Sequence, residues 1–443
     1  MNPDPGSFWR LDPAVVFLNH GSFGSCPRPV LEFQQSLREQ LEHQPVRFLV
    51  REIEERLDAA RVELSRFVGA QPENLAFVTN ATTGINTVLR SVPSEPGDEW
   101  LVTSHEYNAC RNALNLEAER RGVRVMVAEI PFPLPSSNEV VEAVLSRVTP
   151  RTRLALLDHV TSQTGLVLPI ERLVRELEAR GVDALIDGAH APGMVALNLD
   201  ALGAAYYTGN CHKWICAPKS AALLHVRPDR QAQIRPLVIS HGANSPRKDR
   251  SRFQIEFGWM GTSDPTAILS VPEALRQIAA LKPGGWPEVM RANRELALQG
   301  RRLLCEALEI SPPAPDEMIG SLATVPIPDG ASSERLSANV GQASSLTVHG
   351  ASVPRVSGGR MPPELADKMS APHFETRPEP LKSQLYLDPL QDWLMERHAI
   401  EVPVIPWPAP PRRLLRISAQ LYNRREHYET LAAALREALG QRR

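Results

Sequence analysis

Two residues in the middle of the chain have side chains and a spacing that could support chemistry together. The apolar segment LID ends at Asp187, a loop of Gly, Ala, His and Pro follows, and Lys213 comes 26 residues after Asp187, between His212 and Trp214. A single aspartate usually caps a helix, and a single lysine usually lies on the surface. A lysine between two rings in an apolar stretch suits the surface poorly, and burial makes its neutral, nucleophilic amine easier to obtain.

The chemistry that fits this pair uses an aldehyde cofactor with a pyridine ring. A lysine amine forms an imine with the aldehyde, and a carboxylate keeps the ring nitrogen protonated so that the ring accepts electrons from a carbanion at Cα. We therefore predict pyridoxal 5'-phosphate (PLP) as cofactor, held by Lys213 as a Schiff base, with Asp187 at the ring nitrogen.

The elements that position these residues are predicted by apolar periodicity. Helical spacing runs from Val30 to Val68 and ends at Gly69. Short apolar runs then alternate with amphipathic stretches, and the runs lie at 75–79, 99–104, 123–130, 153–160 and 182–187. This βα repetition predicts an α/β fold with a mostly parallel sheet covered by helices, and function in the loops after the strands.

The length of the chain predicts two lobes, because one hydrophobic core normally stops growing below 443 residues. We expect an N-terminal segment bordering the active site (1–30), a large cofactor-binding domain (31–265) and a small C-terminal α+β domain (266–443). Residues 329–384 are rich in Ser, Gly and Pro with little periodicity, so we expect a mobile insertion there, acting either as a lid or as a disordered segment.

The charge and the apolar content of the chain indicate which kinds of partner to expect. The formal net charge is -2, which gives no electrostatic reason to expect nucleic acid, and no stretch of eighteen apolar residues predicts a membrane span. The N-terminus lacks a basic region followed by an apolar run, so we expect a cytoplasmic protein. Five scattered cysteines, without paired CxxC spacing, predict buried thiols rather than a metal site or disulfides.

The spacing between Asp187 and Lys213 also matches that of a known protein family. The chain resembles the class V aminotransferase family of fold-type I PLP enzymes over residues 15–310 and 385–440; that family includes cysteine desulfurases, isopenicillin N epimerase and sulfoxide C–S lyases. In the family, an Asp-x-Ala-(Gln/His) strand end precedes the Schiff-base lysine by about the same distance. The resemblance implies a large domain, a smaller C-terminal domain and a homodimer with shared active sites.

The resemblance implies roles for further residues around the cofactor. In NATTGIN the backbone N–H groups of Ala81 and Thr82, with the Thr82 hydroxyl, would hold the phosphate at a helix N-terminus, although an ordinary N-cap is the alternative. Tyr107 would lie over the ring. The other implied contacts are His190 and Ser162 near the phenolic oxygen, Asn210 and His212 at the phosphate, and Thr262 at the phosphate of the neighbouring subunit.

Two segments are expected to face the substrate. In LLRISAQLYN, Arg416 matches the family arginine that binds the substrate α-carboxylate, a bidentate pair suited to orienting an amino acid; a surface salt bridge is the alternative. The segment FLNHGSFG resembles the entrance of the epimerase and C–S lyase branch, where Asn19, His20, Gly21 and Ser22 would border the substrate.

The absence of one cysteine narrows the reactions that we expect. Desulfurases of the family carry a nucleophilic cysteine shortly before the carboxylate-binding arginine, and no cysteine follows Cys305 here. A persulfide-forming desulfurase is therefore disfavoured. The segment NHGSFG (19–24), Tyr107 and the string HVTSQTG (159–165) favour the epimerase branch, so we expect an isopenicillin N epimerase-like enzyme acting at Cα of an amino-acid substrate. A C–S lyase or an aminotransferase is the alternative. A non-catalytic protein of this fold is disfavoured by the intact set of Asp187, Lys213 and Arg416.

Overall fold

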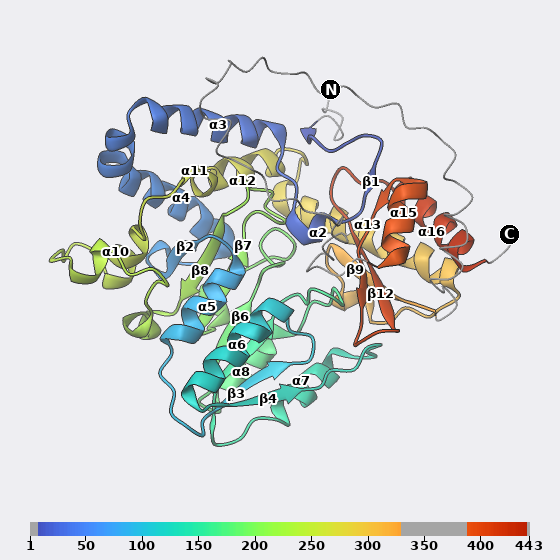
Figure 1. Ribbon diagram of the computed structural model, residues 1–443, viewed down its shortest axis with the longest axis horizontal. Helices are drawn as coiled ribbons and strands as arrows, with labels where there is room; N and C mark the ends of the chain where they lie inside the picture. The colour runs from blue at the N-terminus through green and yellow to red at the C-terminus, as the bar shows by residue number, and fades with distance from the viewer. Residues whose placement is uncertain (1–7, 329–387, 441–443) are drawn as a thin grey trace, which may run out of the picture.

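The computed structural model describes residues 8–328 and 388–440 (Figure 1). A seven-stranded sheet forms the centre, in the order β2-β8-β7-β6-β5-β3-β4. Its strands are β2 (Leu75–Val78), β3 (Glu99–Thr103), β4 (Arg124–Ala128), β5 (Thr152–Asp158), β6 (Asp183–Asp187), β7 (Tyr206–Asn210) and β8 (Ala222–Val226). Only β8 runs opposite to the other six strands of this sheet, so the expected mostly parallel α/β sheet is confirmed.

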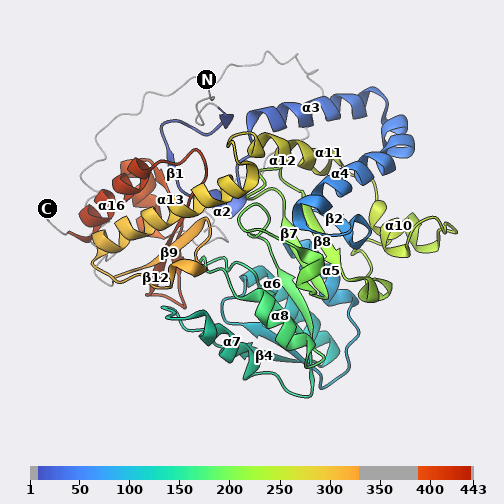
Figure 2. The same ribbon diagram turned by 180° about the vertical axis from the view of Figure 1, so that it is seen from behind.

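Helices cover both faces of the sheet because each strand sends alternate side chains to opposite sides. Leu154 and Leu156 of β5 join the core under α5 (Ala81–Ser91) and α6 (Asn108–Arg121). Ala155 and Leu157 join the core under α7 (Ser137–Leu145) and α8 (Ile170–Glu178). Figures 1 and 2, which view the molecule from opposite sides, show these two helix pairs in turn.

The N-terminal helices pack beside the sheet with a later group. They are α2 (His20–Phe23), α3 (Arg28–His43) and α4 (Ile53–Val68), and the later group comprises α10 (Arg252–Gly258), α11 (Thr266–Leu269) and α12 (Val271–Ala279). As predicted, helix α4 ends at Gly69, whose φ of 64° is the left-handed conformation that glycine adopts at low cost.

The C-terminal part builds a second lobe on the long helix α13 (Gly285–Leu308), which Figure 2 shows in gold. A three-stranded antiparallel sheet, ordered β11-β12-β9, packs with it. Its strands are β9 (Leu322–Ile327), β11 (Val404–Pro406) and β12 (Arg413–Ser418), and the remaining helices are α15 (Pro389–His398) and α16 (Arg425–Leu439). Strand β1 (Val16–Phe17) pairs with β10 (Ile400–Glu401), which ties the N-terminal segment to this lobe.

Strand β7 of the large sheet was not predicted from the sequence. Strand β7 lies within YYTGN, which carries too little apolar alternation to be distinguished from a loop, yet it completes the sheet between β6 and β8. The expected insertion at 329–384 falls outside the described residues. Within the described ranges, no helix is both long enough and apolar enough to cross a membrane.

Candidate active site

The chemically capable residues meet at one edge of the large sheet. Parallel strands place their carboxyl ends together, and Asp158, Asp187 and Asn210 are the last residues of β5, β6 and β7. They border a cavity of about 250 Å³, whose lining includes Ser22, Phe23, Asn80, Ala81, Thr82, Tyr107, Ser162, His190, His212 and Lys213. The sheet therefore brings together most of the residues predicted from the sequence.

The backbone around Lys213 is held by a turn and by a histidine from the N-terminal segment. The Cys216 N–H donates to the Lys213 carbonyl at 3.0 Å, which closes the turn. Nε2 of His20 lies 3.0 Å from the same carbonyl, and the other ring nitrogen is 2.8 Å from the Tyr422 hydroxyl. His20 is fully buried and burial lowers its pKa to about 3, so a neutral His20 donates from Nε2 and fixes the lysine loop.

The Lys213 amine is set up as a neutral nucleophile. Burial lowers its pKa from 10.5 to about 7, and the nearby Arg416 charge acts in the same direction. Nζ lies 3.0 Å from Nε2 of His190, and the Trp214 indole N–H donates to Nδ1 of His190 at 3.4 Å. Because an indole can only donate, Nδ1 carries a lone pair, and neutral His190 therefore has its proton on Nε2, facing an amine that accepts it.

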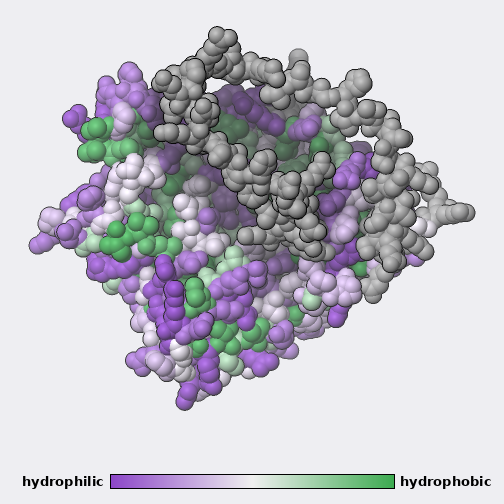
Figure 3. Space-filling model, in the orientation of Figure 1, coloured by the Kyte–Doolittle hydropathy of each residue, from purple (hydrophilic) through white to green (hydrophobic). Residues whose placement is uncertain are grey.

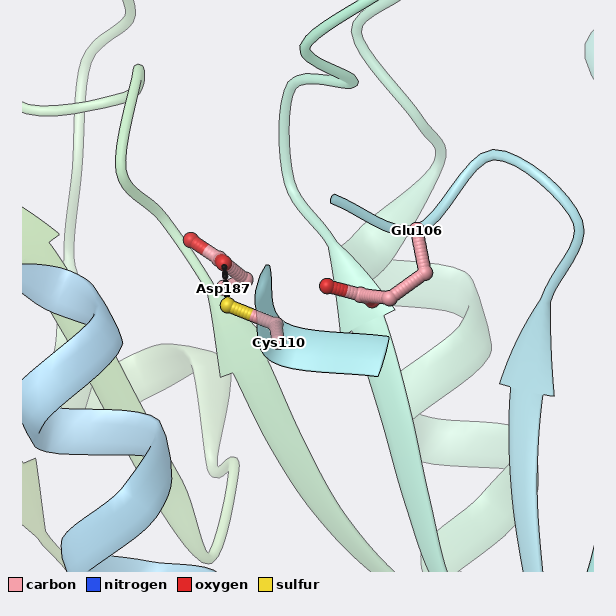
Figure 4. A group of neighbouring side chains, drawn as sticks. All are labelled: Glu106, Cys110 and Asp187. Atoms are coloured by element: carbon pink, nitrogen blue, oxygen red, sulfur yellow. Dashed lines mark hydrogen bonds between the residues drawn. The ribbon is translucent and has the colours of Figure 1, made fainter. Parts of the chain in front are cut away.

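Asp187 accepts hydrogen bonds at both oxygens. The Ala189 N–H donates to Oδ1 at 2.8 Å, and the Cys110 thiol donates to Oδ2 at 3.2 Å, as the dashed line in Figure 4 shows. Burial raises the pKa of Asp187, while these donors and Lys213 favour its charged form. Sequence reasoning missed Cys110, because a cysteine inside an amphipathic helix has the pattern of an ordinary core residue.

The N-terminus of α5 forms another wall of the cavity. Asn80 caps the helix by accepting from the Thr83 N–H at 2.8 Å, and the Ala81 N–H donates to Oδ1 of Asn210 at 2.9 Å. Since the Ala81 amide already has this partner, Asn210 supports the helix terminus itself. Thr82 and His212 also line the cavity, and Nδ1 of His212 lies 3.2 Å from the Ala221 carbonyl.

Arg416, on β12, is buried beside the cavity with an incomplete set of partners. One terminal nitrogen donates to the carbonyl of Ser162 at 2.5 Å, and the other donates to the Ser22 hydroxyl at 2.9 Å. No acidic side chain pairs with it among residues 8–328 and 388–440, and its Nε has no hydrogen-bond partner there. Burial lowers the pKa of Arg416 to about 10, so its charge at neutral pH persists without a protein anion.

Residues of the N-terminal segment have different positions relative to the cavity. Ser22 reaches the cavity, whereas Asn19 accepts from the Ser22 hydroxyl and donates to Glu401 at 3.1 Å. Gly21 allows a close approach, because a Cβ there would lie 2.7 Å from a methyl carbon of Leu322. Phe23, which the sequence interpretation did not single out, lines the cavity with 67% of its surface exposed.

Two predicted residues have exposed side chains. Tyr107 lines the cavity from the start of α6 with 43% of its surface exposed, and burial of the remainder raises its pKa. Thr262 is exposed, on a loop after α10 whose neighbour Gly261 has a φ of 107°. The position of Thr262 on the surface leaves it available to another chain.

These residues fit PLP by the chemistry of their donors. The cavity combines a neutral amine, a buried carboxylate and a helix N-terminus, which match an aldehyde, a ring nitrogen and a phosphate. Glu106, Cys110 and Asp187 also lie close enough to suit a metal ion (Figure 4). Cys110 donates to Asp187, however, and burial and the neighbouring carboxylates raise its pKa, which opposes a thiolate ligand.

Comparison with protein families and curated sequences gives a consistent result. The family model described as Aminotransferase class-V matches residues 25–336. Isopenicillin N epimerase of Amycolatopsis lactamdurans is 34% identical over 441 residues, covering 96% of both chains. A probable chloroplastic L-cysteine desulfhydrase of Arabidopsis thaliana is 30% identical, covering 72% of this chain and 70% of that protein.

Solved structures share the fold at lower identity. A complex of the cystine C-S lyase C-DES with cysteine persulfide has a TM-score of 0.70 at 18% identity, covering 95% of this chain and 97% of that one. A C-DES mutant with glycine covalently linked to its PLP cofactor has a TM-score of 0.72 at 18% identity, covering 98% and 99%.

Proposed function

Because this chain belongs to the class V aminotransferase family and is a PLP-dependent enzyme, we propose that it inverts the configuration at Cα of an amino acid or amino-acid-containing substrate. The similarity to isopenicillin N epimerases over nearly the full chain supports an epimerase or racemase. When bound, PLP supplies an electron sink for the charge left at Cα when a bond there breaks.

The single observation that supports an amino-acid substrate is the environment of Arg416. A buried guanidinium without an acidic partner among the described residues costs free energy unless an anion completes it. The α-carboxylate of an amino acid offers two oxygens in the geometry that a guanidinium binds. Ser22 and Ser162 hold the guanidinium beside the cavity, so the substrate's Cα would lie near Lys213.

Lys213 is the proposed proton carrier. Once its amine is released, its lowered pKa lets it take a proton from Cα, or return one, on one face at neutral pH, and inversion needs a second acid–base group on the opposite face. His190 orients the amine, and Asp187 would hold the protonated ring nitrogen. Tyr107 would stack on the ring, while Thr82 and His212 would hold the phosphate, and the bond between Ala81 and Asn210 would support the helix terminus beside it.

We also propose a homodimer. Exposed apolar side chains, Val46, Val50, Val238 and Ile239, gather near the bend between α3 and α4 and near α10, where Figure 3 shows apolar surface. A cavity of about 450 Å³ lies between these elements. Contiguous exposed apolar surface commonly marks a protein interface, and the exposed Thr262 follows the same elements in the chain.

A C–S lyase is the second candidate. Several L-cysteine desulfhydrases are 28–30% identical over about 72% of the chain, and Lys213 with a leaving group on Cβ meets the needs of that reaction. A desulfurase that forms a persulfide is disfavoured, because all five cysteines of the chain are described and all are buried.

The test is a substrate panel in deuterated water. Purified enzyme is incubated with L- and D-amino acids, amino-acid-containing peptides and cysteine conjugates, followed by chiral and keto-acid analysis. An epimerase yields both configurations with deuterium at Cα and no keto acid. Release of thiol and keto acid instead would establish the lyase. Each substrate is paired with its α-amide, which lacks the carboxylate and should turn over poorly if Arg416 binds that group.

A further inference from the structure

Two buried carboxyl groups beside Asp187, one of which also lines the cavity, have no role in the reaction described above. Glu106 precedes α6 and Asp158 ends β5, and their side chains are only 6% and 2% exposed. Asp158 pairs in register with Asp187 on the neighbouring strand. Figure 4 shows the Glu106 carboxyl directed towards Cys110 and Asp187. Three carboxyl groups thus share one buried space.

The hydrogen-bond donors in this space are too few for three carboxylates. Asp187 takes the Ala189 amide and the Cys110 thiol. Oε1 of Glu106 accepts from the Tyr107 N–H at 3.2 Å, but its Oε2 has no partner, and Oδ2 of Asp158 has none either. A buried oxygen without a donor destabilises the folded state, and more so when it is charged.

A single proton would give both unpartnered oxygens, Oε2 of Glu106 and Oδ2 of Asp158, a hydrogen-bond partner. Glu106 has a carboxylate oxygen within 4.8 Å of one on Asp187, and Asp158 is the register partner of Asp187, so both carboxyl groups lie against the same residue. An ionised carboxylate can only accept a hydrogen bond. A proton on either group turns it into a donor to the other, which satisfies two oxygens at once. We propose that Glu106 and Asp158 share one proton and act as an acid pair that sets the charge beside Asp187.

The surrounding charges support this assignment. Burial and the carboxylates of Asp158 and Asp187 raise the pKa of Glu106 well above its ordinary value, against the weaker influence of Arg111. Burial and Asp187 likewise raise the pKa of Asp158. Cys110 faces the same space as a neutral thiol. With the shared proton, the pair carries one negative charge rather than two, so Asp187 ionises against less repulsion.

The shared proton does not depend on which reaction the enzyme catalyses, whereas its effect on Asp187 rests on the proposed cofactor role. Glu106 and Asp158 are therefore positioning residues, which act on the cofactor site through Asp187. The proton can be measured without any substrate.

The experiment is infrared spectroscopy of the purified holoenzyme at neutral pH. The wild type should show a carbonyl band of a protonated carboxylic acid, and E106Q should lose it, because the amide replaces the shared proton as donor. D158N should lose the same band and serves if E106Q does not fold. The matched control is E99Q: Glu99 is equally buried but pairs with Arg124, so its removal should leave the band in place.

A second readout is the pH dependence of unfolding. The folded pair keeps a proton that the unfolded carboxyls release above about pH 4, so wild-type stability should fall as pH rises. E106Q lacks this proton uptake, and its stability relative to wild type should increase from pH 5 to pH 8, while E99Q should show no such trend. No acid band in the wild type, a band that survives in E106Q and D158N, or a stoichiometric divalent metal in the holoenzyme would each overturn the proposal.

Discussion

At the residue scale, the reactivity of Lys213 comes from where its amine is placed. Its side chain is partly buried at the wall of the cavity, it lies near the Arg416 charge, and its hydrogen-bond partner His190 offers a proton rather than accepting one. Each of these features favours the neutral form. The same burial that lowers the pKa of the lysine also keeps His190 neutral, because burial and the Lys213 charge lower the pKa of His190 well below its ordinary value.

The lowered lysine pKa predicts how cofactor capture depends on pH. Only the neutral amine attacks the aldehyde, so the rate at which apoenzyme captures added PLP should rise about tenfold per pH unit below pH 7. It should level off above about pH 7, where Lys213 is deprotonated. Stopped-flow absorbance at a series of pH values measures this rate, and borohydride reduction with mass spectrometry locates the adduct. Free acetyl-lysine methyl amide is the reference, and its rate should keep rising to about pH 10.

Two results would contradict this prediction. A capture rate that continues to rise above pH 9 would show that Lys213 has an ordinary pKa. An adduct on any other lysine would remove Lys213 from the site.

At the element scale, the lysine loop depends on the N-terminal segment packed against it. Gly24 follows α2 with a φ of 68°, and a Cβ there would lie 2.0 Å from the His212 carbonyl oxygen and 3.0 Å from Cα of Lys213. The Lys219 amine donates to the Gly24 carbonyl at 3.1 Å, which fastens the contact from the other side. Glycine is required here both by conformation and by space.

We predict that G24A disturbs the site beyond its backbone strain. The control is G181A, because Gly181 also has a positive φ, of 71°, but nothing within 4 Å of the added methyl group. G181A should lose about 1–2 kcal/mol of unfolding free energy and capture cofactor normally. G24A should lose more and should also bind PLP more weakly, since the methyl group displaces the Lys213 loop. Denaturant unfolding and PLP titration measure the two effects, and equal behaviour of both variants would disprove the specific contact.

At the scale of the whole molecule, the proposed homodimer connects the exposed Thr262 to the cofactor site of a second chain. A two-fold dimer presents the same surface from each subunit, so each chain would contribute Thr262 to its partner and receive one in return. This arrangement would make the active site incomplete in a monomer.

Mixed dimers can test the shared site. K213A has no lysine for the cofactor and T262A lacks the threonine, so each homodimer should have low activity. Their hybrid contains one site with both wild-type residues and should recover about half of wild-type activity. As the control, a subunit carrying both substitutions is paired with wild type, and this hybrid has no intact site. Recovery in neither hybrid, or a monomer by analytical ultracentrifugation, would refute the shared site.

The sequence by itself determined the α/β class, the cofactor and most of the residues around the cavity. Asp187 and Lys213 could be found because their chemistry is local: one residue ends an apolar strand, and the other lies between two rings. Arg416 could be found because its motif is short and continuous. The periodicity of the strands also indicated which loops would meet, since parallel strands end at one edge.

Only the tertiary structure decided how these groups affect one another. The Cys110 bond to Asp187 joins residues 77 positions apart, and Ser22 reaches Arg416 across 394 positions. The ends of β3, β5 and β6 bring Glu106, Asp158 and Asp187 into one donor-poor space, although each looks like an ordinary acid in the sequence. Protonation depends on burial and on neighbours in space, and neither property is present in a linear pattern.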